Sequence, residues 1–169
     1  MKTVLAVLAL LSATVVSRLV GQGDNESTRK TLAGLTGLYV SVQRIPDEMQ
    51  RDGLDTTQIL TDVELKLRQA GITVLTRQEW LSTEAFPYLY VNVQVTKNSA
   101  RIYAFSVDVE LRQLVTLVHN PAVSTLATTW SATGIIGTVG SQKLGSVRDD
   151  VRDLTDEFIN AYLAANPKR

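Results

Sequence analysis

Apolar and polar side chains alternate most regularly between residues 88 and 112. Odd-numbered positions there are mostly apolar and even-numbered positions mostly polar, on both sides of a turn at residues 97–100. A period of two is typical of a β-strand with one buried face. The segments 89–96 and 103–112 are therefore predicted to form an antiparallel hairpin with one apolar face and one largely solvated face.

The alternation continues beyond this hairpin. Val115 and Leu117 keep the odd-numbered apolar register after a predicted bulge near Gln113, and residues 119–121 break it. Alternate positions from 126 to 132 then predict one more antiparallel strand. These segments together form an antiparallel meander.

Two segments show the three- and four-residue spacing of amphipathic helices. The first is predicted over residues 56–70, where Asp55 and Gln58 resemble a capping box and Gly71 supplies a left-handed stop. The second ends near residue 166, and its apolar stripe consists of Leu144, Val147, Val151, Leu154, Phe158 and Tyr162.

Shorter elements surround the first helix. Residues 38–42 alternate like a half-buried strand and residues 72–75 form a short β-branched run, so strand, helix and strand predict a βαβ unit. Thr76 and Glu79 form a second capping box, which opens a short helix that Pro87 closes.

These elements predict an α/β (α+β) fold, a two-layer sandwich in which helices cover one face of a mixed sheet with an antiparallel meander. The last helix and the strand 103–111 each carry one continuous apolar side. We therefore expect Val151, Leu154 and Phe158 to be buried against that strand.

The N-terminus has the parts of a secretory signal peptide. Lys2 precedes an apolar run over residues 3–16, and Val15 and Ser17 are the small residues of a cleavage site before Arg18. An uncleaved anchor is the alternative, but a membrane span needs about 20 apolar residues. We expect a signal peptide over 1–17, a flexible leader over 18–34 and a single domain over 35–169.

Composition narrows the class of protein. The chain has 17 basic and 17 acidic residues, 44% hydrophobic residues and no cysteine. A balanced charge gives no basis for binding nucleic acid, and the absence of cysteine excludes disulfides and lipid attachment. The expected location is a bacterial periplasm or the extracellular medium, with a fold held by its core alone and no membrane span after cleavage.

Candidate chemistry is sparse. Gly134, Gly137 and Gly140 precede Ser141 at the last helix, and a glycine loop at a helix start can cradle an anion, although such loops also simply connect elements. The alternative function, a small hydrolase or ligand-binding enzyme, would combine this loop with Ser131, Ser141 or His119. No catalytic set, metal site or cofactor is predicted.

Aromatic residues offer a second interpretation. Tyr88, Tyr90, Tyr103 and Trp130 lie on predicted strands, where aromatic rings either pack in the core or form a binding platform. The sequence leaves both possibilities open.

The run "VELKLRQAGITVLTRQEW", which follows the strand at 38–42, resembles the opening unit of periplasmic α/β domains of the TolB N-terminal and CsgG type. The segments "ATTWSATGIIGTVG" and "DEFINAYLAANP" resemble the ending of uncharacterised exported bacterial proteins. The first resemblance implies a non-catalytic domain that docks onto other envelope proteins. We therefore expect an exported binding or assembly module whose partner is an envelope protein or polymer.

Overall fold

The strands of the protein form one mixed sheet. A computed structural model describes residues 16–18 and 23–167, and in it the six strands follow the order β1-β6-β4-β3-β2, with β5 also paired to β4. The strands are β1 Val16–Arg18, β2 Tyr39–Val42, β3 Tyr88–Lys97, β4 Ile102–Leu117, β5 Asn120–Ser131 and β6 Ile135–Gly140.

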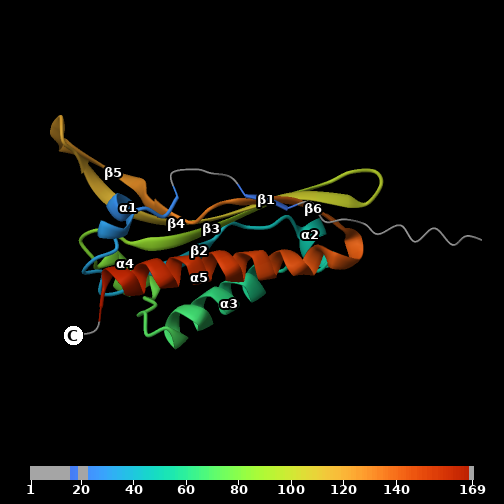
Figure 1. Ribbon diagram of the computed structural model, residues 1–169, viewed down its shortest axis with the longest axis horizontal. Helices are drawn as coiled ribbons and strands as arrows, with labels where there is room; N and C mark the ends of the chain where they lie inside the picture. Colours follow the sequence, from blue (N-terminus) through green and yellow to red (C-terminus); the bar gives the residue numbers. More distant parts are fainter. Residues whose placement is uncertain (1–15, 19–22, 168–169) are drawn as a thin grey trace, which may run out of the picture.

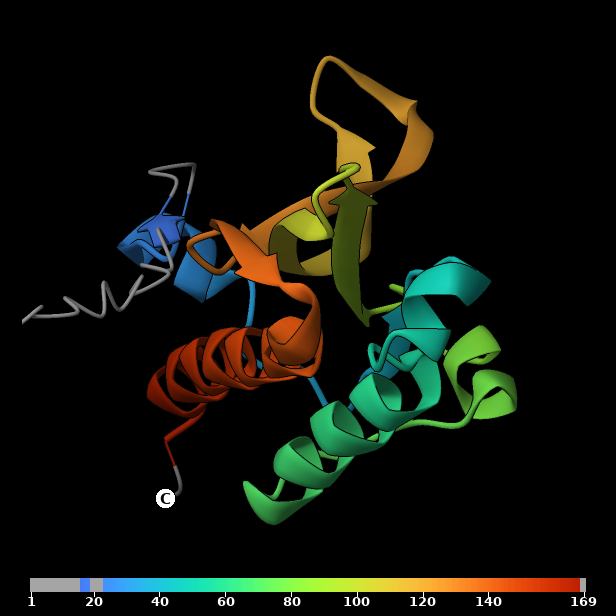
Figure 2. The same cartoon turned by 90° about the vertical axis from the view of Figure 1, so that its right-hand side faces the viewer.

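The two long helices lie side by side on one face of this sheet (Figures 1 and 2). The helices are α1 Glu26–Lys30, α2 Asp47–Arg51, α3 Thr56–Gln69, α4 Arg77–Leu81 and α5 Val147–Ala165, with a 3₁₀ helix, η1 Ser141–Ser146, before α5. The predicted α/β sandwich is confirmed. None of the helices among the described residues combines the length and the hydropathy that crossing a membrane requires.

The predicted hairpin is confirmed as β3 and β4. The strands pair antiparallel from Tyr88↔Arg112 to Lys97↔Tyr103. Buried side chains occupy the odd-numbered positions, and Leu89, Val91 and Leu111 have no exposed surface. Hydrophobic alternation therefore set the register correctly, because a slip of one residue would turn every apolar side chain to the opposite face.

β5 and β6 return along β4 in two pieces. β5 pairs with residues 110–117 of β4 and β6 with residues 102–107, so the segment 132–134 interrupts one long antiparallel run. The bulge predicted near Gln113 falls between Leu111 and Arg112, where the register shifts and Thr129 is the extra residue of β5. The predicted strand at 126–132 is confirmed, and it begins six residues earlier than expected.

Helix α3 begins and ends close to the predicted positions. The Asp55 carboxylate accepts the backbone N–H of Gln58 at 2.8 Å, and Gly71 adopts a positive φ of 80°. The predicted strand at 72–75 is wrong, since it makes only an isolated bridge from Val74 to Leu38. Thr76 already caps α4, so too little extended chain remains to pair, and β3 is the parallel partner of β2.

Helix α5 packs on the sheet as expected. Val151, Leu154 and Phe158 are at most 1% exposed, and the ring of Phe158 meets that of Trp130 edge-on with 5.3 Å between centroids. Leu144 belongs to η1 and is also fully buried. The two apolar sides predicted from the sequence therefore cover each other.

Residues 23–34, expected within a flexible leader, instead fold onto the domain. Asn25 caps α1 through a capping box, and Leu32 is fully buried. The side chain of Asn166 accepts from the backbone N–H of Gly34 at 2.8 Å and donates to the carbonyl of Leu32 at 3.0 Å. The sequence does contain a sign of this, because Asn25 can cap a helix and the apolar Leu32 follows that helix. The polar composition of the segment hid this pattern.

The predicted signal peptide lies largely outside the described residues. Its last two residues, together with Arg18, belong to β1, which pairs antiparallel with β6 through Ser17↔Ile136.

Candidate functional site: the polar face of the sheet

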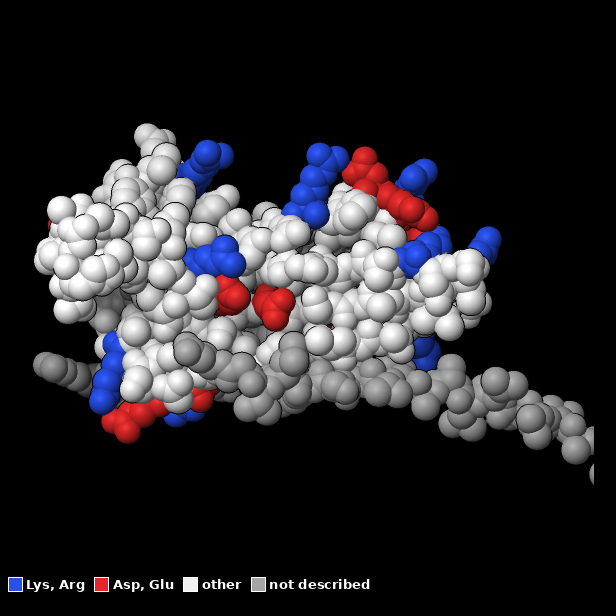
Figure 3. Space-filling view, turned by 90° about the horizontal axis from the view of Figure 1, so that it is seen from above, with Lys and Arg blue, Asp and Glu red and all other residues white. Residues whose placement is uncertain are grey.

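The face of the sheet opposite α3 and α5 carries the even-numbered side chains of β3 and β4. We call it the polar face, and its central residues are Tyr39, Tyr88, Tyr90, Asn92, Asp108, Glu110 and Arg112. All seven are half-buried rather than buried. Figure 3 looks onto this side of the molecule, where basic and acidic groups lie close together.

A row of aromatic rings crosses one end of the polar face. Tyr39 stacks on Trp80 with 5.4 Å between centroids, and Tyr88 meets Trp80 edge-on at 5.9 Å and Tyr90 at 6.4 Å. The parallel register of β2 and β3 sets Tyr39 beside Tyr88. The capping box of Thr76 fixes α4, which carries Trp80 to the end of this row.

Arg112 extends the aromatic row onto β4. Its guanidinium lies over the ring of Tyr90 at 4.1 Å from the centroid, and its Nε donates to Oε2 of Glu110 at 2.9 Å. Thr128 of β5 donates its hydroxyl to the same oxygen at 2.9 Å. The guanidinium is thus held between a ring and a carboxylate, so little side-chain entropy remains to be lost on binding.

Asn92 and Asp108 form a second polar pair at the centre of the face. Nδ2 of Asn92 donates to Oδ2 of Asp108 at 3.3 Å, while Oδ1 of Asn92 is buried without a hydrogen-bond partner among the described residues. Burial raises the pKa of Asp108, the nearby charge of Glu110 raises it further, and the bond from Asn92 opposes both. The pair therefore offers one acceptor without a partner, Oδ1 of Asn92, and one carboxyl group, that of Asp108, whose ionised form is disfavoured by burial.

A shallow depression of about 270 Å³ lies at the far end of the same face. Gln94, Thr96, Ala104 and Ser106 of the β3–β4 hairpin line it together with parts of Val95 and Phe105. The polar face therefore has an aromatic end, a charged centre and an end with small and amide side chains.

The predicted glycine loop does not exist, because residues 135–140 form strand β6. A Cβ on Gly137 would lie 2.7 Å from the ring of Phe105, and one on Gly134 would lie 2.8 Å from Oδ1 of Asp108. Gly140 and Ser141 mark the step from β6 into η1. Two of the three glycines, Gly134 and Gly137, therefore give room to neighbouring side chains.

The residues of the alternative hydrolase site lie far apart. Ser141 follows the residue paired with Ile102, whereas His119 lies in the exposed turn after Leu117. These two ends of β4 are fifteen residues apart, or about 50 Å. Ser131 lies between them, opposite Glu110. The structure therefore does not bring the serines and the histidine together.

The four aromatic residues named from the sequence divide between the two sides of the sheet. Tyr103 and Trp130 are at most 1% exposed and belong to the core, whereas Tyr88 and Tyr90 lie on the polar face. The parity of residue numbers along β3 and β4 could have separated Tyr103 from Tyr88 and Tyr90. Trp80 was missed because it lies on a helix of five residues, too short for a periodic pattern.

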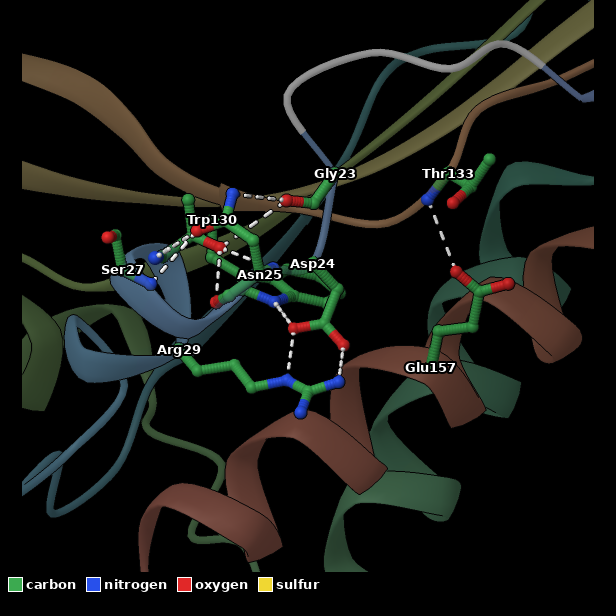
Figure 4. A network of polar contacts seen from close by, with 9 residues as sticks. Gly23, Asp24, Asn25, Ser27, Arg29, Trp130, Thr133 and Glu157 are labelled. Carbon is green, nitrogen blue, oxygen red and sulfur yellow. Dashed lines mark hydrogen bonds and ion pairs between the residues drawn. The ribbon is translucent and has the colours of Figure 1, made fainter.

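Trp130 also anchors the N-terminal segment (Figure 4). Its Nε1 donates to Oδ1 of Asp24 at 3.1 Å, and Arg29 binds both carboxylate oxygens of Asp24, with Nε 2.6 Å from Oδ1. Hydrogen bonding from Arg29 is the main cause of the lowered pKa of Asp24. Nearby, the Glu157 carboxylate accepts from the backbone N–H of Thr133 at 3.2 Å. These hydrogen bonds attach residues 24–29 to β5 and the segment after β5 to α5, so we assign them a structural role.

Within residues 16–18 and 23–167, no group of three or more histidine or acidic side chains is placed to hold a metal ion. No family model matches the sequence, and no curated protein is found to be similar to it.

Proposed function

We propose that this protein is an exported, non-catalytic binding module that recognises a protein of the cell envelope through its polar face. The observation that carries the proposal is the row formed by Trp80, Tyr88, Tyr90 and Arg112, on a sheet face that none of the long helices among the described residues covers. Tyrosine, tryptophan and arginine are the residues that most often supply the binding energy of protein–protein interfaces.

The geometry of the row supports a recognition role. Its rings are held by strands and a capped helix turn, and Arg112 is fixed between Tyr90 and Glu110. Such side chains lose little conformational freedom when a partner binds. The unused acceptor of Asn92 adds a point at which a partner's donor would be selected.

A protein partner fits this face better than a charged polymer. A polyanion requires clustered basic residues, whereas at the centre of the polar face Arg112 is paired with Glu110, and Asp108 lies on the same face. The export expected from residues 1–17 supports a partner in the periplasm or outside the cell.

Site-specific photo-cross-linking in exporting cells tests the proposal. A photoreactive phenylalanine analogue is placed at Gln94 or Thr96, two exposed positions on the polar face, and at Leu65, which is 51% exposed on the helix layer. We expect the first two positions to give the same discrete protein product and Leu65 to give none.

Two results would overturn this assignment. Products of equal yield from the polar face and from Leu65 would show that the face is not selective. A product that contains polysaccharide instead of a second polypeptide would assign the face to a polymer.

A further inference from the structure

The hairpin between β4 and β5 projects beyond the helix layer as a two-stranded arm (Figure 1). We define the arm as residues 114–126. Gln113 is the last buried residue before it, and none of its own side chains is buried. Val118 is 97% exposed, Leu126 46% and Val123 41%. A two-stranded ribbon of this kind has little stability by itself in water.

The arm contains no acidic residue, lysine or arginine. The sequence contains no aspartate, glutamate, lysine or arginine between Arg112 and Lys143. In Figure 3 the end of the molecule that bears the arm is accordingly almost free of coloured groups. Proteins commonly protect exposed strand edges with charged side chains, lysine above all, and this strand has none.

The outer edge of β5 is open along most of its length. Within the part of the chain that the structure describes, β5 pairs with β4 alone. Thr31, just after α1, donates its hydroxyl to the carbonyl of Thr129 at 3.2 Å and so covers one end of the edge. The stretch 122–128 presents its unpaired backbone groups to the outside, and an extended strand is the structure that satisfies such an edge.

We propose that two copies of the chain associate through antiparallel pairing of their β5 edges, about a twofold axis near Thr125. Thr125 is the midpoint of the open stretch 122–128. This pairing is self-complementary, as a twofold interface must be, and it joins two marginal ribbons into a four-stranded sheet.

The chemistry of the arm favours a second copy over a foreign strand. A twofold axis brings the side chains next to it close to their own copies, so a charge near Thr125 would repel its copy, and β5 has no acidic residue, lysine or arginine. At the axis, Thr125 faces its own copy, and a threonine pair of this kind is a favourable cross-strand contact. This surface is distinct from the polar face, so the dimer does not depend on the proposed function.

Sedimentation velocity over a concentration series tests the proposal with the exported protein. We expect a reversible monomer–dimer equilibrium for the natural chain. Thr125→Lys places two ammonium groups beside each other at the axis and should weaken the dimer several-fold or more. Thr138→Lys makes the same change at an exposed position of β6, which pairs with residues 102–107 at the opposite end of β4 from β5, and should leave the dimer intact.

A cysteine pair gives a second readout that does not require loss of stability. Because the chain has no cysteine, Thr125→Cys introduces a single thiol. Residues directly opposite across an antiparallel pair have Cβ atoms about 4.5–5.5 Å apart, near the separation a disulfide spans. Oxidation should link the Thr125→Cys protein into dimers, and Thr138→Cys should stay monomeric on denaturing gels.

A monomeric natural chain at every concentration would overturn the proposal. So would equal weakening by the two lysine substitutions, or equal rates of disulfide formation at the two cysteine positions, since both would place the contact elsewhere.

Discussion

Gly137 and Phe105 show how a single hydrogen at Cα can decide the packing of a strand pair. The two residues are directly opposed in the β4–β6 ladder, and the aromatic ring fills the space that a Cβ on residue 137 would need. From the sequence, the three evenly spaced glycines indicated a loop that could bind an anion. The sequence could not show Phe105 opposite Gly137, because that contact arises only when β6 pairs with β4.

Gly137→Ala is expected to destabilise the fold by roughly 1–3 kcal/mol, since the ring of Phe105 must leave its position. Gly140→Ala, at the end of the same strand, is the matched control because nothing lies within 4 Å of its added Cβ. Chemical denaturation of both variants measures the difference. Equal free energies of unfolding for the two variants would show that the Phe105 ring can move aside without destabilising the fold.

The pKa of Asp108 predicts a pH-dependent effect. Its folded pKa is raised above the ordinary value of about 3.9 by burial and by Glu110. The unfolded chain therefore ionises first, so stability is greatest below the unfolded pKa and falls as the pH rises through the folded pKa. At any pH above the folded pKa, the folded state carries the full free-energy cost of a buried, ionised Asp108.

Asp108→Asn should accordingly raise the melting temperature at pH 7 and give a smaller gain near pH 4, because an amide stays neutral and still accepts from Asn92. Asp153→Asn removes the same charge at an exposed position of α5 and serves as the control. Thermal unfolding at the two pH values provides the measurement. A gain for Asp108→Asn that is the same at both would contradict the assigned cause.

At the scale of elements, α5 is the part of the fold that the sequence predicted best. Its apolar stripe repeats for five turns, so errors at single positions do not change the prediction. Asp55 and Thr76 located α3 and α4 because capping depends on neighbours only a few residues away. Strand β6 and the failed strand at 72–75 depend on distant partners, which local pattern does not contain.

Phe158→Ala should cost about 3–5 kcal/mol, because the ring packs between α5 and the sheet against Trp130 with no exposed surface. Leu163→Ala, at a position 39% exposed near the end of the same helix, should cost less than about 1 kcal/mol. Calorimetric melting of both variants decides the matter. A melting temperature of Phe158→Ala within a degree of the natural protein would mean that α5 is peripheral.

At the scale of the whole molecule, the sheet separates a structural side from a side open to partners. The alternation of β3 and β4 predicted a largely solvated face, and in the part of the chain that the structure describes both long helices lie on the other face. The sequence could not predict the row of aromatic rings and Arg112 on this face. The parallel β2–β3 pairing sets Tyr39 beside Tyr88, the antiparallel β3–β4 pairing sets Arg112 beside Tyr88, and α4 adds Trp80.

The most direct test of the polar face compares two arginine variants in the cross-linking experiment. Arg112→Ala removes the cation held over Tyr90, whereas Arg68→Ala removes an arginine of α3 that is paired with Glu64 on the helix layer. With the photoreactive residue at Gln94, the yield of the partner product should fall at least tenfold for Arg112→Ala, the loss expected of a residue worth about 1.4 kcal/mol or more. Arg68→Ala should leave the yield unchanged. An undiminished yield from a folded Arg112→Ala protein would contradict the assignment of the polar face as the recognition surface.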